Sequence, residues 1–308
     1  MHPAWSVIVF TTVAGAAQGL VVLLALCTLV GVPLNAGFTG GALLLAVAML
    51  LLGLGASFLH LGRPLRAWRA AAMWRTSWLS REVIVLPAFI GVVALWWLTL
   101  QMSGSTPPWL PLLAIVLSAG LWLCTAMIYA CIRFIQEWAH PVTVANYGLI
   151  GLASGTLLGV ALAVGAGDET LARGLLPLAL LLLLGAWAGR TLALLRNKGL
   201  KLKSTLQSAT GIRGAPLVQT SMGMSAGSFN TREFFHGSSA AAVRHVRLAL
   251  HGLCFGAPAV LLVAVWAGAP LVLLPLALAL HVPGLLAERW LFFAQARHPQ
   301  NLYYQTVS

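Results

Sequence analysis

The sequence contains very little charge. Of its 308 residues, 18 are Lys or Arg and only 6 are Asp or Glu, so charged residues make up 8% of the chain. A soluble domain carries about 25% charged residues and uses them to cover its water-facing surface. Hydrophobic residues reach 60%, and the mean hydropathy is +0.91. This composition excludes disorder, a collagen-like chain and a nucleic-acid-binding domain, and it predicts a polytopic helical membrane protein.

Paired cysteines and early basic residues are also missing. The four cysteines lie singly within apolar runs and form no C-x-x-C, so the sequence predicts neither a disulfide framework nor an iron–sulfur motif. No Lys or Arg precedes Arg63. The first apolar run therefore lacks the basic leader of a secretory signal and is too long for one, so we expect a retained helix.

Turn residues divide the apolar sequence into eight segments. The predicted fold class is an all-α integral membrane protein with eight transmembrane helices, forming one domain over residues 1–308. We expect two four-helix halves, residues 1–134 and 143–293, with a long loop over 196–244. The predicted spans lie at about 6–30, 39–60, 81–101, 109–134, 143–166, 173–195, 245–267 and 269–293.

The distribution of basic residues predicts the orientation of these spans. Eight is an even number, so both termini fall on one side of the membrane. Every Lys and Arg except Arg173 sorts to that same side. Because positive residues concentrate in cytoplasmic loops, both termini and the long connections are expected in the cytoplasm.

The densest polar cluster runs from Ser57 to Glu82, between the second and third spans. Ser80 is expected to cap the third span, with Glu82 in its first turn. In one interpretation the arginines here only orient the helices and the tryptophans only anchor them. In the other, His60 is a titratable donor to a quinone carbonyl, Glu82 passes protons to the cytoplasm, and Trp68 walls the ring.

Two rival functions depend on other residues. A b-type cytochrome would need His251 and His281 as axial ligands, but His281 lies deeper in its span than His251, by about 9 Å at 1.5 Å per residue. An interhelical hydrogen-bonding histidine is the alternative role for each. A transporter would need buried charge along its spans, and this chain has very little.

The 196–244 loop has two interpretations. It can be a flexible basic loop held near anionic lipid. Alternatively, its segment Met222–Gly237, which carries Phe229, Phe234 and Phe235, forms a docking surface for a soluble partner, because aromatic side chains supply contact area.

Several segments resemble the membrane anchor subunits of dimethyl sulfoxide reductase-type molybdoenzymes. Those anchors belong to a broader family of eight-helix, quinone-reactive, haem-free subunits found beside polysulfide and nitrite reductases. The branch that anchors membrane-bound sulfite-oxidising complexes is the most similar. The matching segments are Ala56–Trp68, Leu79–Glu82, Ile128–Phe134, Gly227–Glu233 and Ala287–Phe293.

The resemblance implies a quinone-reactive subunit that leaves the molybdenum chemistry to its partners. It implies ubiquinone or menaquinone as cofactor, no haem or iron–sulfur cluster in this chain, and two partners, an iron–sulfur subunit and a molybdopterin catalytic subunit. A bacterial inner membrane, with the partners on the cytoplasmic face, fits quinone reduction coupled to sulfite oxidation; a quinol-oxidising anchor of a sulfoxide-type reductase is the alternative. The implied roles are quinone binding by His60, Arg63, Arg66 and Trp68, with the arginines stabilising negative charge on the reduced oxygen, proton relay by Glu82, and partner docking by Phe229, Arg232, Phe234 and Phe235.

Overall fold

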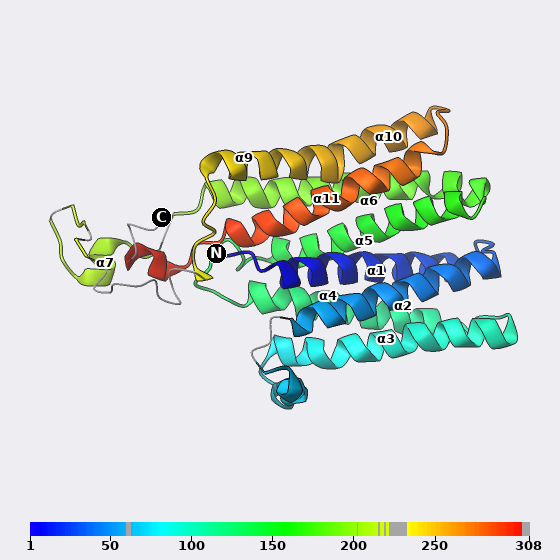
Figure 1. The fold of residues 1–308 in the computed structure, drawn as a ribbon, viewed down its shortest axis with the longest axis horizontal. Helices are drawn as coiled ribbons and strands as arrows, with labels where there is room; N and C mark the ends of the chain where they lie inside the picture. The colour runs from blue at the N-terminus through cyan, green and yellow to red at the C-terminus, as the bar shows by residue number, and fades with distance from the viewer. Residues whose placement is uncertain (60–62, 202, 215, 219, 222–232, 304–308) are drawn as a thin grey trace.

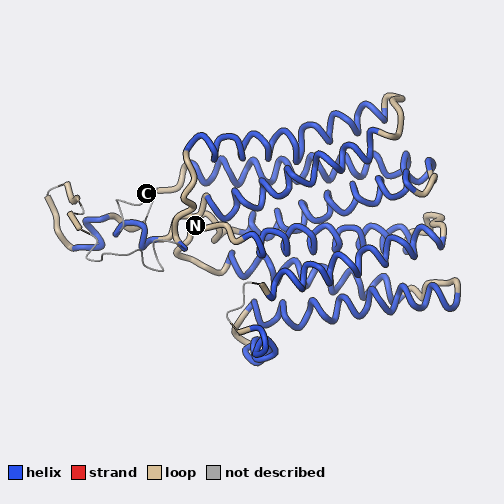
Figure 2. Tube along the Cα trace, viewed as in Figure 1, coloured by secondary structure: helices blue, strands red, loops and turns tan. Residues whose placement is uncertain are grey.

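The chain folds into a bundle of long helices lying side by side (Figures 1 and 2). The computed structural model describes all residues except 60–62, 202, 215, 219, 222–232 and 304–308. In that part of the chain every regular element is helical, and eight helices are long and apolar enough to cross a membrane. The predicted all-α class and the eight spans are therefore confirmed.

The spanning helices follow the predicted segments closely. They are α1 (Trp5–Leu29), α2 (Ala36–Phe58), α3 (Trp78–Ser103), α4 (Trp109–Ala130), α5 (Pro141–Gly165), α6 (Glu169–Lys198), the continuous helix α9 (Ala240–Ala249), η2 (Leu250–Gly256) and α10 (Ala257–Trp266), and α11 (Leu273–Ala294). The shorter elements are η1 (Pro64–Met73), α7 (Leu206–Thr210) and η3 (Pro299–Tyr303). The long loop between α6 and α9 thus covers 199–239, shorter than predicted at both ends.

The start of α3 differs from the prediction. Ser77, not Ser80, caps the helix, and its hydroxyl accepts a hydrogen bond from the Ser80 backbone N–H at 3.3 Å. The extended backbone of Ser77 makes it a favourable N-cap, and the helix begins at Trp78. Glu82 therefore lies one turn deeper than expected, outside the first turn where the helix dipole would favour it most.

The 3-10 helix η1 lies across the ends of α2 and α3 rather than continuing either (Figure 1). Its residues are mostly exposed, and Trp68 is 72% exposed. Arg69 lies over the Trp68 ring at 5.4 Å, and Arg81, in α3, lies over Trp78 at 4.2 Å. Tryptophan paired with arginine is typical of a segment at the membrane–water boundary, which is where the sequence placed it.

Helices α1 and α5 make the closest approach in the bundle. A Cβ atom on Gly19 would overlap the backbone of Gly151, and one on Gly155 would overlap the backbone of Gly19. Small residues at such positions let two membrane helices meet backbone to backbone. This contact joins the first four spans to the last four, and the division into two four-helix halves stays a prediction.

The two ends of the bundle differ in kind. One end, which we call the loop end, carries the start of α1, η1, the 199–239 loop and the residues after α11 (Figure 1). At the opposite end the helices are joined by short turns. Each of the four turns there contains one glycine with positive φ, namely Gly31, Gly104, Gly167 and Gly268. These turns lie where the Gly- and Pro-containing segments predicted them.

Candidate functional site

Glu82 is buried at the loop end of α3. It is 5% exposed, and it faces α4, where the Thr125 hydroxyl donates a short hydrogen bond to its Oε1. A carboxyl group removed from water at the end of a span is costly, and such groups mark functional sites in membrane proteins. Glu82 is thus placed to hold and release a proton inside the protein rather than directly at the cytoplasmic surface.

The other quinone-site residues predicted near Glu82 lie on or beside η1. Arg63 precedes the first turn of η1, and Arg63, Arg66 and Trp68 are all exposed. His60 lies outside the described residues, between Leu59 at the end of α2 and Arg63. The structure therefore brings these segments to the same end of the bundle, while the side chain of Glu82 is turned inward and those of Arg66 and Trp68 outward.

A second buried charge cluster lies between α6 and α11. Glu288 Oε1 is 2.8 Å from Arg190 Nε, and Glu288 Oε2 is 2.9 Å from Arg289 Nε. The three side chains are at most 4% exposed. Arg289 also lies over the ring of Tyr147, 4.2 Å from its centroid. The sequence analysis counted Arg190 and Arg289 only as residues that orient the helices; the structure corrects this, because both guanidinium groups are enclosed by protein.

A small polar cavity separates these two groups of residues. Thr125, Tyr147 and Arg289 line it, and its volume is about 20 Å³. A cavity of this size has room for one water molecule. Among the described residues, four side-chain atoms on its wall lack a hydrogen-bond partner: Thr12 Oγ1, Gln18 Oε1, Trp122 Nε1 and Tyr147 OH. Bound water would satisfy these groups, so the interior next to the Glu82–Thr125 pair is polar.

The two histidines considered for haem have partners within the protein. His281 is 1% exposed, and its Nδ1 is 2.6 Å from the carbonyl oxygen of Cys254. Because a carbonyl can only accept, Nδ1 carries a proton, and Ser154 Oγ lies 2.8 Å from the other ring nitrogen, Nε2. His251 Nδ1 accepts a hydrogen bond from Trp187 Nε1 at 2.9 Å. His281 thus has the contacts of an interhelical hydrogen-bonding histidine, the alternative that the sequence analysis weighed against haem.

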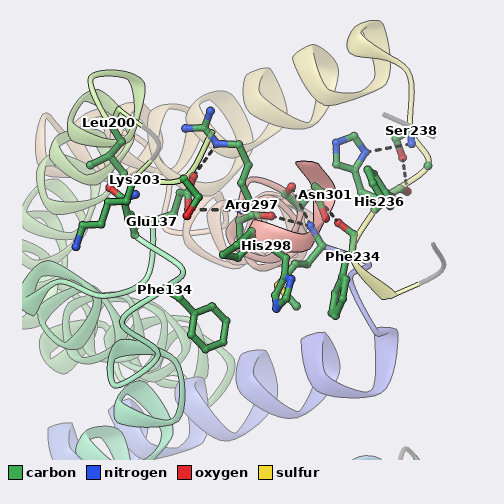
Figure 3. Close-up of a pocket in the computed structure, with 18 of the residues that line it drawn as sticks. Phe134, Glu137, Leu200, Lys203, Phe234, His236, Ser238, Arg297, His298 and Asn301 are labelled. Carbon is green, nitrogen blue, oxygen red and sulfur yellow. Dashed lines mark hydrogen bonds and ion pairs between the residues drawn. The ribbon is translucent and has the colours of Figure 1, made fainter. Parts of the chain in front are cut away.

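The predicted docking segment lines the largest pocket at the loop end. This pocket measures about 880 Å³ and includes Phe234 and Phe235 (Figure 3). The Phe234 ring stacks on His298 with centroids 3.8 Å apart, and Asn301 donates to the Phe234 carbonyl oxygen at 3.1 Å. The other two docking residues, Phe229 and Arg232, lie outside the described residues. Phe234 is therefore held against the C-terminal segment of its own chain.

The pocket walls carry several titratable groups. Arg297 Nε donates to Glu137 Oε1 at 2.8 Å, and Lys203 lines the same pocket (Figure 3). Burial lowers the pKa of His236 and of His298, and the nearby ammonium group of Met1 lowers both further. Both rings are consequently neutral at pH 7, so the aromatic part of the pocket presents uncharged surface beside a half-exposed ion pair.

Comparison with known proteins places the chain in a family. The family model described as "DMSO reductase anchor subunit (DmsC)" matches residues 1–293. The chain belongs to the DmsC anchor family. Two relatives illustrate this: a sulfite dehydrogenase subunit of Allochromatium vinosum is 44% identical over 100% of both chains, and "Anaerobic dimethyl sulfoxide reductase chain YnfH" of Escherichia coli is 33% identical over 37% of this chain and 41% of the relative. The resemblance drawn from the sequence is confirmed.

For this member of the DmsC family, sequence reasoning found some of the buried polar residues and missed others. It selected Glu82, which the structure buries, but it gave no role to Thr125, Tyr147 or the Arg190–Glu288–Arg289 cluster. The signal for the cluster was present, because Arg190 lies eight residues inside the end of α6 and Glu288 and Arg289 lie inside α11. Groups of three or more His, Cys, Asp or Glu side chains that could hold a metal ion are absent from the part of the chain that the structure describes.

Proposed function

We propose that this chain is the quinone-reactive membrane anchor of a sulfite dehydrogenase-type complex. In this role it passes electrons between a partner iron–sulfur subunit and membrane quinone, and a molybdopterin subunit oxidises sulfite. The full-length identity of 44% to a subunit of a sulfite dehydrogenase is the observation that carries the proposal. An anchor of a multi-subunit complex and a multi-pass membrane protein is what the family membership itself establishes.

The proposed quinone site lies at the loop end, around the residues that join α2 to α3. A quinone head group requires a hydrogen-bond donor, a group that exchanges protons and an apolar approach from the bilayer. The chain offers His60 as donor, the buried carboxyl of Glu82 as proton carrier, and exposed Leu59 and Trp68 beside the membrane boundary. The residues present therefore fit the group, which when bound takes up electrons and protons.

Each residue has a distinct proposed task. His60 donates to the ring carbonyl, and Arg63 or Arg66 stabilises negative charge that develops on that oxygen. Glu82 holds the proton and transfers it. The Thr125 hydroxyl fixes the orientation of the Glu82 carboxyl from α4, which leaves the second carboxyl oxygen for proton exchange.

The loop end is proposed to face the cytoplasm of a bacterial inner membrane, because nearly all Lys and Arg residues lie there. The soluble partners then dock on that face, with Phe229, Arg232, Phe234 and Phe235 contributing to the contact. This arrangement delivers electrons from a cytoplasmic donor to quinone, which is the direction that sulfite oxidation requires.

The site is tested by turnover of the assembled complex with quinone as electron acceptor. His60→Ala removes one hydrogen bond, which contributes about 1–3 kcal/mol, so quinone binding should weaken about 5- to 150-fold. Glu82→Gln keeps the size and the hydrogen bond but carries no proton, so it should slow turnover more than it weakens binding. Electron transfer from sulfite to a soluble artificial acceptor should persist in both variants, because the partner subunits are unchanged.

Two exposed residues provide matched controls. His245→Ala removes a histidine at the same end of the bundle, and Glu169→Gln removes a carboxylate at the opposite end. Both should leave quinone-coupled turnover unchanged. Near-normal turnover in His60→Ala would contradict the proposed site, and loss of the partner subunits from that variant would assign His60 a structural role instead.

A further inference from the structure

A separate pocket lies at the loop end between α6, η2 and the segment after α11. Its volume is about 210 Å³. Its walls include the last residues of α6, the end of α9, the first residues of the π-helical stretch η2, and the residues that follow α11. A π-helical turn in a longer helix often marks a functional position. None of the quinone-site residues named above lines this pocket.

The pocket presents mainly cationic groups and hydrogen-bond donors. Lys198, Arg247 and Arg297 line it, and Glu137 is the carboxylate that lines it with them. Glu137 already accepts from Arg297 Nε at 2.8 Å, so this carboxylate is occupied. Three cations against one paired carboxylate leave an excess of positive charge facing the empty space.

Two polar side chains add directed donors. The Oδ1 atom of Asn197 accepts from Arg196, while its buried Nδ2 has no partner among the described residues. His251 receives the Trp187 indole N–H at Nδ1, so the proton of its neutral ring lies on Nε2, where it is available as a donor. A buried donor without a partner is costly, and a ligand rich in acceptor oxygens would satisfy it.

The surroundings of the pocket are apolar and exposed. Leu195 lines the pocket and is 58% exposed, and Leu248, next to Arg247 in the sequence, is 63% exposed. On a membrane-spanning helix, leucines exposed in this way face lipid chains. The pocket therefore joins a cationic cavity at the membrane boundary to a surface that acyl chains would cover.

We infer that this pocket binds the phosphodiester head group of an anionic phospholipid. Phosphate oxygens would accept from Arg247, Lys198, His251 Nε2 and Asn197 Nδ2, and the acyl chains would lie along Leu195 and Leu248. Basic pockets between spanning helices at the cytoplasmic side bind anionic head groups in this manner. The lipid would hold the end of α6 against η2, close to the Glu137–Arg297 pair.

The inference is tested on the purified complex, with soluble partners attached, by native mass spectrometry during titration with phosphatidylglycerol or phosphatidylcholine. We expect one tightly held phosphatidylglycerol and no comparable phosphatidylcholine. Each basic residue near a lipid surface contributes about five-fold in affinity. Arg247→Gln should therefore weaken phosphatidylglycerol binding about five-fold, and Arg247→Gln with Lys198→Gln about 25-fold.

Arg244 provides the matched control, because it is exposed on the same helix and does not line the pocket. Arg244→Gln should bind phosphatidylglycerol like the unaltered complex, and Arg247→Lys should retain most of the affinity. Equal losses in Arg244→Gln and Arg247→Gln would overturn the inference. So would phosphatidylglycerol binding only after the soluble partners are stripped, which would identify a protein contact, or inorganic phosphate binding as tightly as the lipid, which would identify a free-anion site.

Discussion

His281 is held by a backbone carbonyl that its neighbouring helix cannot use. Pro258 has no N–H, so it cannot donate to the carbonyl of Cys254 four residues earlier. The imidazole Nδ1–H of His281 takes that place at 2.6 Å. The helices come close enough for this contact because a Cβ on Gly284 would overlap the backbone at Cys254. One proline, one glycine and one histidine thus fix the position of α11 against η2.

Glu288 balances two buried arginines at once, so its removal should be severe. Glu288→Gln would leave Arg190 and Arg289 buried without a counter-charge, which typically costs about 3–5 kcal/mol. We expect a loss of that size in the free energy of unfolding, measured by denaturant titration in detergent micelles.

The comparison for this variant is Glu137→Gln. Its partner Arg297 is 48% exposed and can be solvated by water, so the expected loss is about 1 kcal/mol or less. Equal stability losses in Glu137→Gln and Glu288→Gln would show that burial of the arginines does not set the cost.

Much of the residue-level chemistry was hidden from the sequence. Glu82 could be selected because an acidic residue next to an apolar span is rare in this chain. Its partner Thr125 is 43 residues away, and Ser154 is 127 residues from His281. No local pattern specifies such pairs, since each depends on which helices are neighbours and on how they are rotated.

At the scale of helices, the sequence predicted spans and turns well because hydropathy and Gly–Pro turns are local signals. It did not predict that α1 and α5 are neighbours, because apolar helices are alike in composition and differ in shape. The deciding feature is the row of glycines on α5, Gly151, Gly155 and Gly159, of which the first two meet the backbone of α1 and the third the Leu23 side chain.

This glycine contact predicts a strong effect of added volume. Gly155→Leu would force the two backbones apart, and overpacking of this kind costs about 1–3 kcal/mol or more. We expect a lower thermal unfolding midpoint in detergent. Gly174→Leu in α6 is the control, because a Cβ there meets nothing within 4 Å. A Gly155→Leu protein as stable as Gly174→Leu would contradict the backbone contact.

For the whole molecule, the shared position of the two chain ends predicts a simple topology experiment. A protease-sensitive tag fused after Ser308 should be protected in intact cells and cleaved in inverted membrane vesicles, because the basic loop end is expected in the cytoplasm. A tag at the Gly104–Pro108 turn should show the opposite pattern. Cleavage of the Ser308 tag from outside intact cells would reverse the orientation.

The burial of α1 has a consequence for how the protein is made. This helix is synthesised first, yet 72% of its most apolar segment is enclosed by protein in the finished bundle. Its closest partner, α5, leaves the ribosome more than a hundred residues later. During that interval the glycine face of α1 must be covered by lipid or by a component of the insertion machinery. Assembly is therefore completed by replacing those temporary contacts with α5, so the centre of the molecule closes only after its first half has entered the membrane.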